Sequence, residues 1–350
     1  MSEQLIINLD ATSLGYSSCL RNYKLSVIDG YREIPSASII YGVAIHKFID
    51  VMYKTSGNFK IAREESIESF NVTKSQKVPK GKEYLLDQRH MEIVATNIWL
   101  QYIEEEEKNF SLITIPQKCF WCGGSGVIEH CNSECSGVTN VVSCEHCSGA
   151  GIINGPATEL NFHFMFYEDE AIKVYLCGTI DRIGKIAGGC FAIRDWKTTG
   201  SWNTEQYFRR YEMSRQLRLY ILACKLMAER EPDSILGKIG ATKMGAFIDA
   251  IFLDKSPNES KVASSEMFSY SNQELQEFKE QLIDWCGYVS NAVQFNSFPK
   301  QGILNGTCVQ PYGECKFWNV CKNNDMVATL LLKREFTQRE YNPLNFNGEE

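Results

Sequence analysis

The sequence predicts an α/β fold in which a mixed β-sheet is flanked by helices. Segments that alternate apolar and polar residues, as strands do, are interleaved with longer segments of helical periodicity. The chain has 350 residues, of which 44% are hydrophobic, so it can bury a sizeable core. Residues 115–155 break the pattern because they are rich in glycine and cysteine and poor in aliphatic residues. They indicate an insertion into a larger domain.

Composition and charge argue against a strongly basic, a membrane-spanning or a secreted protein. The formal net charge of −7 gives no overall basic surface, so any contact with nucleic acid must be local. Residues 73–82, which hold four lysines and no acid, are the first candidate for phosphate contacts. The sequence has neither a membrane-length apolar run nor a signal peptide at its start. With 14 cysteines and no secretion signal, we expect a cytoplasmic protein whose clustered cysteines bind metal.

For the N-terminal part, the sequence predicts a short strand and three helices. The strand covers Leu5–Asn8, and a short helix after it presents Cys19. Tyr41–Tyr53 has a buried stripe at helical spacing with His46 off its centre. Histidines on helices are more often structural than ligands, so His46 alone decides nothing. Glu83–Lys108 is typical of one long helix.

The insertion carries two copies of the pattern CxxCxGxG, at residues 119–126 and 144–151. A CxxC pair places two thiolates at one tetrahedral centre, and the glycines let backbone amides turn toward the sulfurs. Two such pairs complete a four-cysteine zinc site. The predicted ligands are Cys119, Cys122, Cys144 and Cys147. The site is of the structural type, and it can also dock DNA or a protein partner.

Cys131 and Cys135, beside His130, leave two interpretations open. They are free thiols or loop contacts, which we favour, or they form a second, poorer zinc site.

A β-hairpin follows the insertion and carries two acids and a lysine. Its arms are Lys173–Gly184 and Cys190–Lys197, joined at a Gly-Gly turn. Asp195 and Lys197 point to one face of the strand, where Asp181 can lie beside them, and Trp196 points to the other. Two carboxylates and an ammonium on one sheet face suit a hard divalent cation and a water molecule. A surface salt bridge is the alternative for an isolated DxK.

Elements on either side of the hairpin complete the predicted core. The strand Glu159–Tyr167 opens with an acid, Glu159, that can approach the cation from one side. The amphipathic helix Glu212–Arg230 places Gln216 and Tyr220, four residues apart, on one face. Further along, we expect a strand at Gly245–Asp254 and a helix at Asn272–Phe295.

Three cysteines near the end of the chain leave a tetrahedral set one ligand short. They are Cys308, Cys315 and Cys321, and Cys19 from the other end of the chain is a natural fourth. Four thiolates from both ends suit a 4Fe–4S cluster that ties the ends together, with zinc as the competing occupant.

Together these pieces resemble the RecB-like branch of the PD-(D/E)XK nuclease superfamily in its iron–sulfur form, which includes the AddB recombination subunit and the CRISPR-adaptation nucleases. The resemblance runs from Ser13 to Cys321 and rests on six segments in the order of the family. They are SxxxxxC at Ser13–Cys19, GVAIH with His46, GTIDRI with Asp181, DWK with Asp195 and Lys197, QLRLY with Gln216 and Tyr220, and the cysteines 308, 315 and 321. The cysteine repeats separately resemble the zinc-binding repeat of DnaJ-type cochaperones.

The resemblance implies a restriction-endonuclease-like fold and a Mg²⁺- or Mn²⁺-dependent DNA nuclease. It implies that Asp181 and Asp195 bind the metal, with the Trp196 carbonyl and His46 or Glu159 completing the shell. Lys197 would position the attacking water, and Gln216 and Tyr220 the substrate strand. It also implies a preference for single strands or DNA ends, in recombination, repair or replication.

This sequence departs from the family in three ways. The second acid is aspartate where many members have glutamate, Leu20 replaces the usual proline after the first cluster cysteine, and the zinc insertion lies outside the common core.

We expect the chain to divide into five parts. They are an N-terminal helical part at 1–114, the zinc insertion at 115–155, the nuclease core at 156–300, an iron–sulfur segment at 301–335 and a disordered tail at 336–350.

Two rival functions remain open. The first is a non-catalytic DNA-binding or scaffold subunit of a nuclease complex, and the second, less favoured, is an electron-transfer protein.

Overall fold

A mixed, seven-stranded sheet forms the centre of the computed structural model, which describes residues 4–70, 78, 81–103, 110–122, 124–131, 139–186, 188–200, 203–310 and 313–343. Its main path runs β1 (Leu5–Leu9), β9 (Ile172–Ile186), β10 (Phe191–Thr199), β11 (Met244–Phe252) and β12 (Lys261–Ser264), while β3 (Phe110–Leu112) and β8 (Thr158–Glu168) also pair with β9. The β1–β9 and β10–β11 pairs are parallel and the others antiparallel. The predicted α/β fold with a mixed sheet is confirmed.

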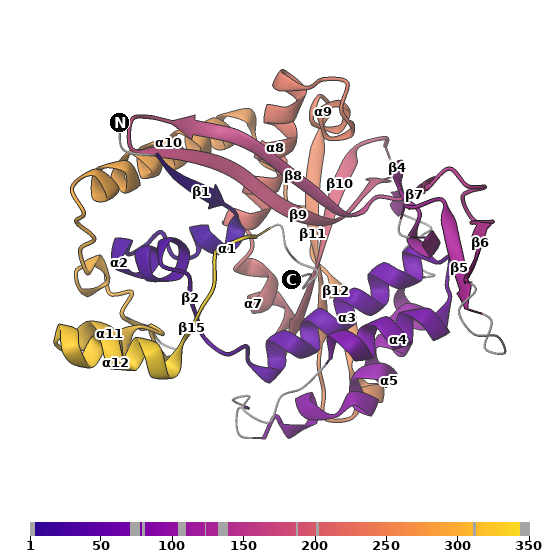
Figure 1. Cartoon of the computed structure of the whole chain (residues 1–350), viewed down its shortest axis with the longest axis horizontal. Coiled ribbons are helices and arrows are strands. Elements are labelled where there is room, and N and C mark those ends of the chain that lie inside the picture. The colour runs from indigo at the N-terminus through magenta and orange to yellow at the C-terminus, as the bar shows by residue number, and fades with distance from the viewer. Residues whose placement is uncertain are drawn as a thin grey trace.

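Helices cover the sheet on two sides (Figure 1). The larger core packs α8 (Arg215–Arg230) and α10 (Asn272–Gln294) against one face. A second core lies between the sheet and α3 (Ala37–Lys54) and α5 (Gln88–Ile98), with α4 (Phe59–Ser69) beside them. Trp196 belongs to this second core, so it does point away from the face that carries Asp195.

The single helix expected at Glu83–Lys108 is wrong. Residues 83–86 form a 3₁₀ turn, and α5 begins only after Asp87, whose side chain accepts hydrogen bonds from the amides of Arg89 and His90. An aspartate favours the start of a new helix because its carboxylate accepts hydrogen bonds from the free amides of the first turn. The backbone of Asp87 is extended, so the preceding 3₁₀ turn ends there. Trp99–Ile103 then continues as a π-helix, and residues 104–109 lie outside the described part.

The remaining elements connect this core to the two ends of the chain. They are α1 (Ala11–Leu14), α2 (Leu20–Tyr23), a π-helix (Lys24–Ile28), β2 (Tyr31–Arg32), α7 (Thr204–Arg209), α9 (Ile235–Gly240), short 3₁₀ turns at Phe120–Cys122, Pro257–Glu259 and Gln301–Ile303, β13 (Val309–Gln310), β14 (Gly313–Glu314), α11 (Trp318–Lys322), α12 (Asp325–Glu335) and β15 (Thr337–Gln338).

The C-terminal segment differs from the disordered tail that the sequence predicts at residues 336–350. Within its described part, β15 pairs antiparallel with β2, and the Tyr341 hydroxyl donates to Asp10. The guanidinium of Arg32 lies 4.3 Å from the centre of the Tyr341 ring. Residues 336–343 therefore fold back onto the N-terminal segment.

The insertion is a pair of two-stranded ribbons at the edge of the molecule (Figure 1). β4 (Thr114–Lys118) pairs with β7 (Ile152–Pro156), and β5 (Val127–Cys131) pairs with β6 (Thr139–Ser143). Among the described residues, no helix is both long and apolar enough to span a membrane.

Candidate active site

The two acids lie where the central hairpin opens. The β9–β10 ladder runs from Phe191↔Lys185 to Arg194↔Arg182 and ends there. Beyond it, β10 continues alongside β11 alone, with Asp195 opposite Ile248. The carboxylate of Asp181 bridges the opening, because its Oδ2 accepts a hydrogen bond of 2.9 Å from the backbone amide of Trp196.

Asp195 is surrounded by the side chains that follow it in the sequence. The Lys197 ammonium forms an ion pair with Oδ2 of Asp195. The Gln216 side-chain amide donates to Asp195 Oδ1 at 2.8 Å and to the Tyr220 hydroxyl at 2.9 Å. Ser214 caps α8 by accepting from the Leu217 amide, which starts the helix so that Gln216 faces the sheet. Gln216 therefore orients the Asp195 carboxylate, and Tyr220 contacts Gln216.

Helix α3 brings a histidine to the same place. His46 Nδ1 lies 3.7 Å from Oδ2 of Asp181. One turn earlier, a Cβ on Gly42 would lie 2.7 Å from Oγ1 of Thr198, so a larger residue there would push α3 away from β10. Glycine at this position therefore sets the close approach of the helix that positions His46.

The protonation states suit metal binding. Burial, together with the Lys197 charge, lowers the pKa of His46 to about 4, so the imidazole is neutral at pH 7 and has a lone pair to share. Burial raises the pKa of Asp195 to about 6, although Lys197 opposes the change. Burial also raises the pKa of Asp181. For Lys197, burial disfavours the charge, but Asp195 and Asp181 outweigh it and raise its pKa. The positive charge of Lys197 therefore does not offset the cost of burying the two aspartates in their charged form.

Two more acids adjoin this group. Burial and then the charges of Asp181 and Asp50 raise the pKa of Glu159 to about 8, and the Glu159 backbone has a φ of +50°. That conformation costs a non-glycine residue about 1–3 kcal/mol and is typical of functional sites.

Asp50 is a residue that the sequence interpretation missed. It lies one helical turn after His46, and its Oδ2 pairs with Lys54 at 2.8 Å while its buried Oδ1 has no hydrogen-bond partner among the described residues. The i,i+4 spacing of His46 and Asp50 on α3 is the signal that could have found it.

The opposite face of the sheet carries a second charged cluster. Asp249 on β11 accepts from Arg182 at 2.6 Å and from the Ser264 hydroxyl at 2.7 Å, and Arg194 Nε lies 3.1 Å away. Arg182 also donates to the Tyr53 hydroxyl and lies 4.5 Å from the centre of the Trp196 ring. Asp249 and the two arginines are almost completely buried, so they support the strands from behind.

The four cysteines of the insertion form a compact group. Their sulfur atoms all lie within 4.8 Å of one another, with 3.8 Å between Cys119 and Cys144 and 3.7 Å between Cys122 and Cys147. A tetrahedral zinc with Zn–S bonds of about 2.3 Å requires sulfurs about 3.8 Å apart. The donor set and spacing therefore fit zinc.

Backbone amides support these sulfurs. The amide of Gly126 donates to Cys122 at 3.3 Å, and that of Gly151 donates to Cys147 at 3.2 Å. Hydrogen bonds from Gly126 and Gly124 outweigh desolvation and lower the pKa of Cys122 to about 6, which favours the thiolate. The placement of Cys135 and of the Cys131 side chain lies outside the described residues, as does most of the lysine-rich segment 73–82.

The cysteines of the two chain ends also lie near one another, but more loosely. Burial and the neighbouring Cys19 thiol raise the pKa of Cys308, and Cys19 likewise contributes to the raised pKa values of Cys315 and Cys321, which burial mainly causes. The Cys315 amide donates to the Cys308 carbonyl at 2.8 Å.

Two hydrogen bonds hold the N-terminal segment against the C-terminal one. The Leu20 amide donates to Gln301 at 3.0 Å, and Asn305 donates to the Ser18 carbonyl at 2.6 Å. Among the described residues, the only group of three or more His, Cys, Asp or Glu side chains whose ligand atoms all lie within 4.8 Å of one another is that of the insertion. The sulfur atoms of Cys19, Cys308, Cys315 and Cys321 are not so closely spaced.

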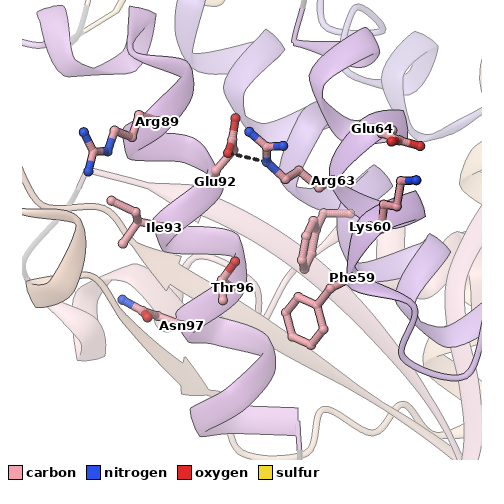
Figure 2. Close-up of a pocket in the computed structure, with 10 residues that line it drawn as sticks. Phe59, Lys60, Arg63, Glu64, Arg89, Glu92, Ile93, Thr96 and Asn97 are labelled. Carbon is pink, nitrogen blue, oxygen red and sulfur yellow. Dashed lines mark hydrogen bonds and ion pairs between the residues drawn. The ribbon is translucent and has the colours of Figure 1, made fainter.

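A hollow of about 610 Å³ lies elsewhere, between α4 and α5 (Figure 2). The ion pair of Arg63 and Glu92, 2.7 Å apart, crosses it. None of the predicted site residues lines it.

The comparisons with known proteins agree with this geometry. The family model described as the PD-(D/E)XK nuclease superfamily matches residues 14–322. No curated protein matches the chain significantly. The matched range includes the histidine, both hairpin acids, the lysine and all four cysteines of the chain ends.

Proposed function

The chain belongs to the PD-(D/E)XK nuclease superfamily, and on this basis we propose that it is a Mg²⁺- or Mn²⁺-dependent DNA nuclease of the RecB-like iron–sulfur branch. We propose that it processes single strands or DNA ends during recombination, repair or replication, in the cytoplasm of a bacterium or of a phage's host cell. One observation carries the proposal. His46, Asp181, Asp195 and Lys197 come from three separate elements and meet at the opening between β9 and β10.

The residues at this opening fit a divalent cation. Asp181 and Asp195 would hold it, with His46, Glu159 and the Trp196 carbonyl as further donors. When bound, the metal acts as a Lewis acid and offsets the charge that develops on the phosphate. Lys197 holds the attacking water and favours its deprotonated form. Gln216 keeps Asp195 in place, and the Tyr220 hydroxyl, whose pKa burial raises, remains a hydrogen-bond donor to the substrate strand.

The cysteine groups have different proposed roles. Cys19, Cys308, Cys315 and Cys321 would hold a 4Fe–4S cluster that joins the two ends of the chain. The compact group of the insertion would hold a structural zinc ion, which shapes a surface for DNA or a protein partner.

The test of catalysis uses labelled single- and double-stranded DNA with Mn²⁺. Asp181→Ala and Lys197→Ala should each abolish cleavage while leaving the melting temperature close to that of the unsubstituted protein. If metal-dependent cleavage survives in both variants, these residues do not form the active site. If the unsubstituted protein binds DNA without cutting it, the scaffold alternative is correct.

The test of the cofactors is spectroscopy with metal analysis after anaerobic purification. We expect iron, zinc and the visible absorbance of an iron–sulfur cluster. A colourless protein with zinc and no iron would overturn the cluster assignment.

A further inference from the structure

The outer face of the β1–β8–β9 part of the sheet carries a row of polar and aromatic side chains. The opposite face packs Phe162, Val174 and Leu176 into the main core. On the outer face, Asn161 lies opposite Thr179, and His163 lies opposite Cys177. Asn161 and His163 are exposed.

Two rings in this row are stacked. The His163 and Tyr175 rings lie 4.6 Å apart, centre to centre, with only 14° between their planes. The His163 Nε2 shares a hydrogen bond of 3.1 Å with Oδ1 of Asn8, which fixes the orientation of the imidazole. The rings therefore form a rigid π-surface, and such surfaces bind unpaired bases of any sequence.

The row leads to the candidate active site. Thr179 donates to Asn161 at 2.6 Å and lies two residues before Asp181. Asn161 lies two residues after Glu159, where the backbone turns. From Tyr175 to Asp181 is six residues of strand, or about 20 Å at the usual rise. A nucleic-acid strand of a few nucleotides can therefore span from the rings to the acids.

At the outer end of the row, a lysine lies beside the Tyr175 ring and is paired with the acid on the neighbouring strand. The Lys173 ammonium lies 5.9 Å from the centre of the Tyr175 ring and 3.6 Å from Glu168 Oε1. Proteins that bind single strands combine aromatic rings, which stack on the bases, with basic side chains that contact the backbone, and Lys173 would serve a strand here by exchanging Glu168 for a phosphate.

We propose that this face guides a single strand of DNA to the acids, with a base stacked on the His163–Tyr175 pair. The proposal rests on the nuclease function proposed above and adds the surface along which a single strand reaches the acids. An unpaired strand is required because only unpaired bases expose a face for stacking.

The test measures the affinity of a fluorescent oligothymidine of about 20 nucleotides, with Ca²⁺ in place of Mn²⁺ so that no cleavage occurs. Tyr175→Leu should weaken binding about tenfold, whereas Tyr175→Phe, which keeps the ring, should bind within about twofold of the unsubstituted protein. Tyr288→Leu is the control, because Tyr288 is a tyrosine on α10, outside the row, and is 67% exposed.

A second ligand separates stacking from a purely structural role. An oligonucleotide of the same length without bases should bind the unsubstituted protein as weakly as oligothymidine binds Tyr175→Leu. If Tyr175→Leu lowers the melting temperature but leaves affinity unchanged, the ring pair only stabilises the sheet and the proposal is wrong.

The two proposals fail in different ways. If the unsubstituted protein cuts DNA and Tyr175→Leu binds and cuts equally well, the strand path is wrong and the nuclease stands. If the protein never cuts but loses affinity on Tyr175→Leu, the path stands and the nuclease assignment is wrong.

Discussion

The two faces of β10 carry similar charged groups that serve opposite purposes. On one face, Asp195 and Lys197 join Asp181 across the opening of the hairpin. On the other, Arg194 joins Arg182 around Asp249. Both clusters are largely buried, and both use residues from neighbouring strands.

Charge balance separates the two clusters. Both oxygens of Asp249 accept hydrogen bonds, and two guanidinium groups surround it. The face with Asp195 instead holds several acids whose pKa values burial raises, with Lys197 as the ammonium nearest to them. A buried cluster that balances its own charges supports the fold, whereas one that lacks positive charge is prepared to receive a cation.

The largest effect is expected from a substitution on the face of β10 that carries Asp195. Asp195→Asn should reduce DNA cleavage by at least about 10³-fold, because a metal ligand is lost along with the several kcal/mol that the metal supplies. The free energy of unfolding of the metal-free variant should stay the same or rise, because a buried charge is removed. Steady-state cleavage assays and urea denaturation measure the two quantities. A variant that unfolds readily would show that Asp195 is structural.

A substitution in the charge-balanced cluster around Asp249 should instead lower the free energy of unfolding. Asp249→Asn leaves two buried guanidinium groups without their carboxylate, so the free energy of unfolding should fall by about 3–5 kcal/mol. Asp284→Asn on the exposed side of α10 is the matched control and should change it by less than about 0.5 kcal/mol. Urea denaturation of both variants tests this. A loss below about 1 kcal/mol for Asp249→Asn would mean that the two faces do not differ as described.

The pH dependence of stability gives a smaller effect. The pKa of Asp195 is about 6 in the folded protein, compared with about 3.9 in an unfolded chain. The folded state therefore binds this proton more tightly, and its contribution to stability is greatest below about pH 4 and is lost as the pH rises through about 6. Glu159, whose pKa is raised to about 8, extends the loss to higher pH.

Urea denaturation of the metal-free protein should show that the free energy of unfolding falls as the pH rises from about 4 to 6. In Asp195→Asn the fall should be smaller, because the contribution of Asp195 is missing. An identical slope in the variant would show that other groups cause the dependence.

Local patterns predicted the acid face well. Strand alternation was enough to place Asp195 and Lys197 together and Trp196 opposite, because it depends only on neighbouring residues. The cluster on the other face could not be predicted. Asp249 reaches Arg182 through the parallel pairing of β10 with β11, and three helices separate these strands in the chain. Glu159 was a candidate from its place at the start of a strand, but its left-handed backbone was not expected, because no local pattern indicates it.

Polar residues misled the helix prediction. Apolar periodicity continues from Glu83 to Trp99, but Asp87 caps a new helix and ends the first one. The return of residues 336–343 was also missed, because their polar composition resembles that of a disordered tail. Their order comes from one short strand pairing and from the contacts of Tyr341.

The parallel pairing of β1 with β9 has a consequence for the newborn chain. β1 is made first, yet its partner strand starts at Ile172. At about 5–20 residues per second, the ribosome takes on the order of 10–30 s to make the intervening segment. During that time Ile7 and Leu9, which are buried in the finished sheet, have no strand to cover them. The first strand of this sheet therefore waits for a partner that is made much later, and it joins the sheet only after β9 has left the ribosome.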